Sequence, residues 1–89
     1  MIGRLKIIGS NNQILPVGSE YNAAKLITNK LIVNSRAMEG TPAEPILEEK
    51  VLTLDIKNVN ICAEHVHVDA WIVDEESNGG RVEFELYWI

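Results

Sequence analysis

The strongest constraint on the fold is a strict alternation of apolar and polar residues in the last part of the chain. Two runs show it, 65–73 and 81–89, and the sequence Ser77-Asn78-Gly79-Gly80 lies between them. A period of two is typical of a half-buried β-strand, and Asn-Gly between two such runs is typical of a hairpin turn. These residues therefore predict an antiparallel β-hairpin.

The length of the hairpin turn decides which side chains share a face, because a shift of one residue moves a whole set to the other face. A loop of two or four residues would mix charged residues into the apolar stripe. A three-residue loop, 78–80, separates the faces and has a glycine where such loops need a left-handed residue. We therefore predict this loop, with Ile72 opposite Leu86 and Ala70 opposite Trp88.

The polar face of this hairpin carries two histidines, three carboxylates and two large aromatic side chains. In the predicted register, Trp71 and Tyr87 are direct cross-strand neighbours. Tyr and Trp are over-represented among the residues that dominate binding at protein interfaces. The face is predicted to be a binding surface, or else to be covered by a second layer such as a helix. Its residues are His65, His67, Asp69, Trp71, Glu83, Glu85 and Tyr87.

One segment, 19–30, favours a helix. Ser19 can cap its N-terminus, and Glu20 lies in the first turn, where a negative charge is favourable. Three apolar residues recur at a spacing of four and would form one stripe: Ala23, Ile27 and Leu31. Residues 25–35 are also compatible with two strands joined by a turn, so both possibilities stay open.

Other segments predict strands and connections. Residues 4–9 and 13–17 predict a pair of short strands around an Asn-Asn turn, and residues 52–57 alternate as a half-buried strand does. Residues 57–60 predict a turn, and the two prolines and the glycine within 36–45 predict a loop. The chain is thus predicted to be α+β, a predominantly antiparallel sheet with one short helix. An all-β sandwich or a small barrel is the alternative.

Length and composition limit the class of protein. The chain of 89 residues fits a single domain, 1–89, and its one cysteine, Cys62, excludes an internal disulfide. The apolar neighbours of Cys62 favour a small buried side chain over a reactive thiol. No apolar run reaches the roughly 20 residues of a membrane span, and the first residues lack a secretory signal. We expect a soluble, cytoplasmic protein.

Charge is unevenly distributed along the chain. Residues 1–38 carry five basic residues and one acidic residue, whereas residues 39–89 carry three basic and twelve acidic residues. The net charge of −5 argues against direct nucleic-acid binding, which needs clustered Lys and Arg. The two parts could neutralise each other within the fold. Alternatively, the acidic part faces a basic partner, or opposite faces meet between subunits.

Only one group of residues resembles a chemical site. His65, His67 and Asp69 alternate on one strand and could converge on a metal ion, although two surface histidines that are merely solvated are the simpler interpretation. No nucleophile elbow or phosphate-binding glycine loop occurs, so neither catalysis nor a cofactor is expected.

We expect a non-enzymatic interaction protein. It would bind another macromolecule, such as the basic, nucleic-acid-binding surface of a larger protein that it inhibits, as small viral or mobile-element proteins do. A second hypothesis is a homo-oligomeric subunit, or a carrier of a small ligand, because the last strand stays apolar to its end and would be covered by a neighbouring chain. A metal-dependent enzyme that uses His65, His67 and Asp69 is the third.

Overall fold

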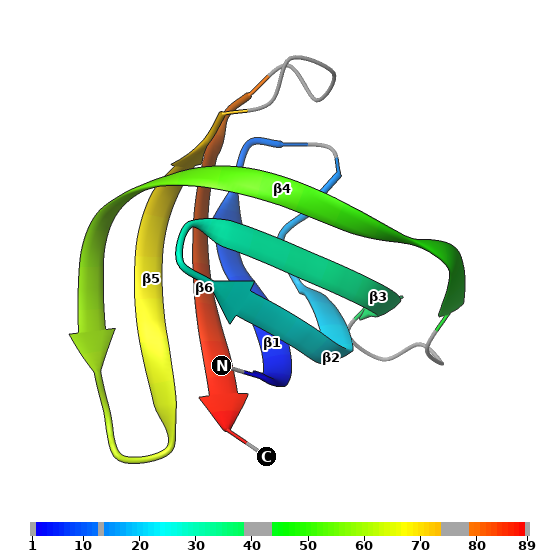
Figure 1. Ribbon diagram of the computed structural model, residues 1–89, viewed down its shortest axis with the longest axis horizontal. Coiled ribbons are helices and arrows are strands. Elements are labelled where there is room, and N and C mark those ends of the chain that lie inside the picture. The colour runs from blue at the N-terminus through cyan, green and yellow to red at the C-terminus, as the bar shows by residue number, and fades with distance from the viewer. Residues whose placement is uncertain (1, 13, 39–43, 74–78, 89) are drawn as a thin grey trace.

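The protein is an all-β barrel. The computed structural model describes residues 2–12, 14–38, 44–73 and 79–88, and none of these residues forms a helix that could cross a membrane. Each strand pairs antiparallel with the next one, and β6 pairs with β1, which closes the barrel (Figure 1). The strands are β1 (Ile2–Ser10), β2 (Ser19–Ile27), β3 (Lys30–Met38), β4 (Glu44–Ile61), β5 (His65–Ile72) and β6 (Arg81–Trp88). The predicted α+β fold is therefore wrong, and the small-barrel alternative fits.

The segment predicted as a helix, Ser19–Lys30, forms β2, a turn and the first residue of β3. Thr28 in this turn has a positive φ of 55°. The expected helical stripe does not form, because Leu31 is fully buried whereas Ile27 is 55% exposed. Pairing with β1 and β3 gives β2 backbone partners on both sides, and a helix of this length has little intrinsic stability with which to compete.

Ser19 has a different role from the expected helix cap. It is fully buried, and its Oγ donates a hydrogen bond of 2.6 Å to the carbonyl of Pro16. A strand was also predicted at 13–17. The described residues of this segment, 14–17, form no strand and belong to the connection between β1 and β2. Leu15 of this connection is fully buried, so the connection closes one end of the core.

The positions of β3 and β4 bear on three further predictions: the turn at 57–60, the loop at 36–45 and the burial of Cys62. Residues 57–60 lie inside β4 and form no turn. Residues 36–38 and 44–45 of the predicted loop belong to strands, and residues 39–43 lie outside the described part of the chain. Cys62 is exposed rather than buried, because β4 extends beyond the body of the barrel before the chain turns there.

The buried face of the C-terminal hairpin is confirmed. Its inward side chains form the centre of the core together with those of the other strands, and all are less than 5% exposed: Val66, Val68, Ala70, Ile72, Val82, Phe84 and Leu86. The predicted register is wrong, since Ala70 lies opposite Val82 and not opposite Trp88. This difference of six residues is even, so every side chain stays on its predicted face.

Candidate functional site

All seven residues of the predicted binding surface lie on the outer face of β5 and β6. They alternate with the buried residues of the same two strands and are half-buried or exposed. Tyr87 is not a neighbour of Trp71, as the predicted register required. The direct cross-strand pairs are His65 with Tyr87, His67 with Glu85, Asp69 with Glu83 and Trp71 with Arg81.

Asp69 and Arg81 form a two-pronged ion pair across this face. Arg81 Nε donates to Oδ1 and Nη2 to Oδ2 of Asp69, both over 3.0 Å. The hydrogen bonds from Arg81 hold the pKa of Asp69 below its usual value, and the same bonds raise the pKa of Arg81. Asp69 is therefore a charged residue with its oxygens already engaged, rather than a free base or metal ligand.

Each histidine on this face has a carboxylate of its own. His67 Nε2 lies 2.7 Å from Glu83 Oε2, and His65 Nε2 lies 2.8 Å from Glu85 Oε2. The two imidazoles thus bind different carboxylates instead of converging on one ion. No group of three or more His, Cys, Asp or Glu side chains within the described residues is arranged to hold a metal ion.

Tyr87 connects this network to β1. Its hydroxyl donates to Glu85 Oε1 over 3.1 Å, its ring lies 4.8 Å from that of His65, and the Arg4 guanidinium lies 5.0 Å above the ring. Burial raises the pKa of Tyr87, and the hydrogen bond to Glu85 and its charge raise it further. Tyr87 therefore remains a protonated hydrogen-bond donor at neutral pH.

Sequence reasoning missed the three cations of this face: Arg4, Lys6 and Arg81. Arg81 could have been found, because it shares the odd-numbered positions of Glu83 and Glu85. Arg4 and Lys6 become neighbours of Tyr87 and Glu85 only through the pairing of β1 with β6. Because three basic side chains accompany the three carboxylates, the face carries both charges in equal number.

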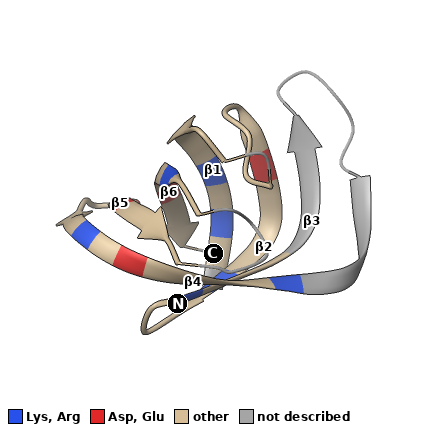
Figure 2. Cartoon of the chain, turned by 90° about the horizontal axis from the view of Figure 1, so that it is seen from above, with Lys and Arg blue, Asp and Glu red and all other residues tan. Residues whose placement is uncertain are grey.

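Charges elsewhere on the described strands are also interspersed. Along β4, Lys50, Asp55 and Lys57 change sign twice, as Figure 2 shows. The side chains that the structure describes comprise seven basic and six acidic residues. The excess negative charge therefore belongs to residues 34–49 and 74–76, whose side chains are outside the described set.

The outer face also contains an apolar strip that starts at Trp71. Trp71 is 46% exposed and lies between Asp55 on β4 and Arg81 on β6. Val73, two residues further, is 58% exposed and donates from its backbone N–H to the carbonyl of Thr53. On the outer side of β4 and β2, Val51 and Ile27 are exposed by 53% and 55%. Lys30 and Thr53 lie between Ile27 and Val73 across the strands, so Ile27 is separate. The apolar strip consists of Val51, Trp71 and Val73.

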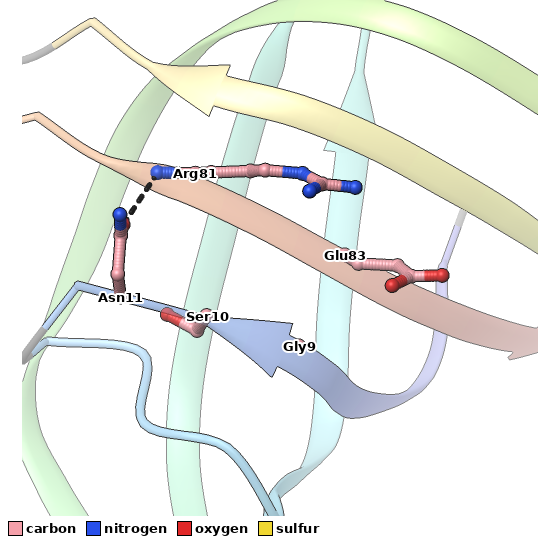
Figure 3. A pocket seen from close by; sticks show the side chains of 5 residues that line it. All are labelled: Gly9, Ser10, Asn11, Arg81 and Glu83. Carbon is pink, nitrogen blue, oxygen red and sulfur yellow. Dashed lines mark hydrogen bonds between the residues drawn. The ribbon is translucent and has the colours of Figure 1, made fainter.

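A small hollow lies at the end of the polar face, where β6 begins. Its volume is about 210 Å³, and Gly9, Ser10, Asn11, Arg81 and Glu83 line it (Figure 3). Asn11 Oδ1 accepts a hydrogen bond of 2.7 Å from the backbone N–H of Arg81. The hollow is smaller than the roughly 300–1,000 Å³ of most small-molecule sites.

Comparison with known proteins found no matching family model, no matching curated protein and no matching solved structure. The functional interpretation therefore depends on the geometry of the described residues.

Proposed function

We propose that the protein is a non-catalytic interaction module that binds another protein through the outer face of β5, with Trp71 as its anchor. The observation that carries the proposal is the position of Trp71, which is 46% exposed and in direct register with Arg81. Trp and Arg are the residues most enriched among those that dominate interface binding energy. Here both stand on one strand pair.

The surroundings of Trp71 support a protein as the partner. The apolar strip would form the apolar centre of an interface, and the ion pair of Asp69 with Arg81 would form part of its polar rim. Specific protein interfaces combine a desolvated apolar centre with such a margin. Nucleic acid would instead require an array of unpaired basic side chains, and the described face has equal numbers of both charges.

The same geometry favours binding over catalysis. Asp69, Glu83 and Glu85 each accept a hydrogen bond or an ion pair from a neighbour, so none is a free general base. The previously expected basic partner has less support than a protein of mixed charge, because these carboxylates are already paired. Strand β5 is hydrogen-bonded on both sides, so the backbone that carries Trp71 is ordered before binding, which lowers the entropy cost of association.

The test is capture of partners from a lysate of the source cells on the immobilised protein, followed by affinity measurements with each enriched partner. Trp71→Ala should weaken binding by about 2 kcal/mol, roughly thirtyfold. Trp88→Ala is the matched control, because Trp88 is 40% exposed but lies at the other end of the hairpin.

Circular dichroism establishes that both variants fold. Equal affinity of wild-type protein and a folded Trp71→Ala variant would rule out Trp71 as the anchor. An equal loss in both variants would show that the effect is not specific to this face.

A further inference from the structure

The second half of β4 has a backbone edge to which no described residue pairs. Strand β4 pairs with β3 up to Thr53 and with β5 from Leu54 to Ile61. The last hydrogen bond on the β3 side runs from Leu54 N–H to the carbonyl of Asn29, over 2.7 Å. Figure 1 shows β4 (green) passing the β2–β3 hairpin and then running down beside β5 (yellow). We call the side of residues 55–61 that faces away from β5 the free edge, because no described residue bonds to it there.

The free edge presents backbone groups that are ready to pair. Cys62 N–H donates to the carbonyl of His65 over 2.9 Å, so Cys62 is bonded on the β5 side. In an antiparallel ladder, successive residues direct their N–H and C=O groups to opposite sides of the strand. Val59 and Ile61 therefore direct these groups toward the free edge. Such an unpaired row is a template for another strand.

Two side chains next to the free edge have a neighbour on the β5 side but, among the described residues, no strand on the other side. Val59 lies opposite Val68 and Ile61 opposite Val66, so each pair shares the inner face of the sheet. Val68 is fully buried and Val66 is 3% exposed, whereas Val59 is 46% and Ile61 80% exposed. One further strand beside β4 would cover the two exposed side chains as β4 and β6 cover those of β5.

We propose that a second copy of this chain pairs with the free edge, antiparallel and about a twofold axis at Asn60. In this register, Val59 lies opposite Ile61 of the second copy, and Ile61 opposite its Val59. Their backbone groups form four hydrogen bonds, and the apolar side chains cover one another. Asn60 meets the same residue of the second copy on the outer face.

The charges at the two ends of this segment favour the second copy and the antiparallel direction. Residues 58–63 carry no charge, and they are flanked by Lys57 and Glu64, both exposed. Within the chain, Lys57 Nζ lies 2.8 Å from Asp55 Oδ2 at the surface. Antiparallel pairing about Asn60 places Lys57 of one copy opposite Ala63 of the other, so that Glu64 is one residue away at both ends. Parallel pairing would place like charges together, which destabilises a strand pair.

This proposal moves the expected oligomer interface to another strand. The sequence suggested that the apolar last strand would be covered by a neighbouring chain. Instead, β6 is paired with β1 on one side and with β5 on the other, so both of its edges are used within the chain. The uncovered strand is the end of β4.

The first test is the mass of the full chain in solution, measured by sedimentation equilibrium over a range of concentrations. We expect a reversible dimer, twice the chain mass of 9.9 kDa. Val59→Lys should weaken the dimer by roughly tenfold or more, because it buries a charge in the new sheet. Val17→Lys is the matched control, since Val17 is 52% exposed and lies outside both the free edge and the apolar strip, and it should leave dimerisation unchanged.

The second test uses the only cysteine as a probe of register. The proposed pairing places Asn58 directly opposite Cys62 of the second copy, at a position without direct hydrogen bonds, where side chains come closest. Asn58→Cys in the wild-type background should therefore form a covalent dimer on mild oxidation. The wild-type chain and the Asn58→Cys/Cys62→Ser double variant should not.

A chain mass of 9.9 kDa at every concentration would overturn the proposal. So would equal cross-linking in all three proteins, or a folded Val59→Lys variant that dimerises normally. If the chain stays monomeric and Val59→Lys abolishes binding of a different protein, the free edge accepts a foreign strand and self-pairing is wrong.

Discussion

The outer face of β5 and β6 and the free edge of β4 belong to the same sheet, but their interactions differ. On β5 and β6, every strand edge is paired, and each acidic side chain has a basic, histidine or hydroxyl partner. At the end of β4, one backbone edge is open and Ile61 is 80% exposed. The polar face is thus complete within one chain, whereas the end of β4 lacks a strand.

This difference arises from unequal strand lengths. Strand β4 has 18 residues and β3 has nine, so β3 can cover only the first part of β4. The β2–β3 turn at Thr28 and Asn29 marks the position where this cover stops. A barrel closed by strand order can therefore still leave a backbone edge unpaired.

The largest expected effect on stability comes from a substitution that would separate β1 from β6 and so leave β6, like the end of β4, with an unpaired edge. A Cβ atom on Gly3 would lie 1.8 Å from the carbonyl oxygen of Tyr87, so Gly3→Ala should force β1 away from β6. We expect a loss of roughly 3 kcal/mol in the free energy of unfolding, measured by urea denaturation. Gly9→Ala is the control, because its Cβ would meet only the side chain of Glu83, with Oε1 at 3.3 Å and Cβ at 3.6 Å. Similar losses in the two variants would contradict this account.

A smaller effect on stability should distinguish the buried strand β5 from the end of β4 at one cross-strand pair of valines. Val68 and Val59 lie directly opposite each other, but Val68 is fully buried and Val59 is 46% exposed. Val68→Ala should lower the free energy of unfolding by about 2 kcal/mol, and Val59→Ala in dilute solution by less than about 0.5 kcal/mol. Urea denaturation of both variants measures this difference. If Val59→Ala costs as much as Val68→Ala, then the end of β4 is covered within the monomer.

The smallest effect concerns the ion pair of the polar face. Because Arg81 lowers the pKa of Asp69 below its unfolded value of 3.8, the pair stabilises the fold above that pH. The stabilisation should disappear as the pH falls below 3.8 through the lower pKa of the folded state. Thermal unfolding of wild type and Asp69→Asn from about pH 2 to pH 6 should show a difference that vanishes at the acid end. A difference that is constant across this range would show that Asp69 stays paired when protonated.

The sequence predicted part of the fold well, for a local reason. Alternation in 65–73 and 81–89 identified the buried faces of β5 and β6, because side-chain direction repeats every two residues whatever the register. The prediction of a helix at 19–30 failed, because the apolar residues of this segment fit both a helical and an extended spacing. Only pairing with strands on both sides decides such a segment in favour of the extended form.

The candidate site was predictable to the same extent. Its seven residues were placed on one face because they alternate, but their partners were not. The pairs of His65 with Glu85 and of His67 with Glu83 require the observed register of β5 and β6. The role of Arg4 requires the closure of the barrel, which joins residues far apart in the chain. The apolar strip likewise brings Val51 of β4 together with Trp71 of β5 and Val73, the residue after β5.

By itself, the sequence determined the side-chain faces of the C-terminal hairpin, the uncharged segment 58–63 and the position of the excess acidic residues. These are properties of neighbouring residues, and the period of a strand converts them directly into structure. The tertiary structure alone decided the charge balance of the polar face and the opening at the end of β4. Both depend on which strands meet and how far each one extends, and the packing of the whole barrel determines this.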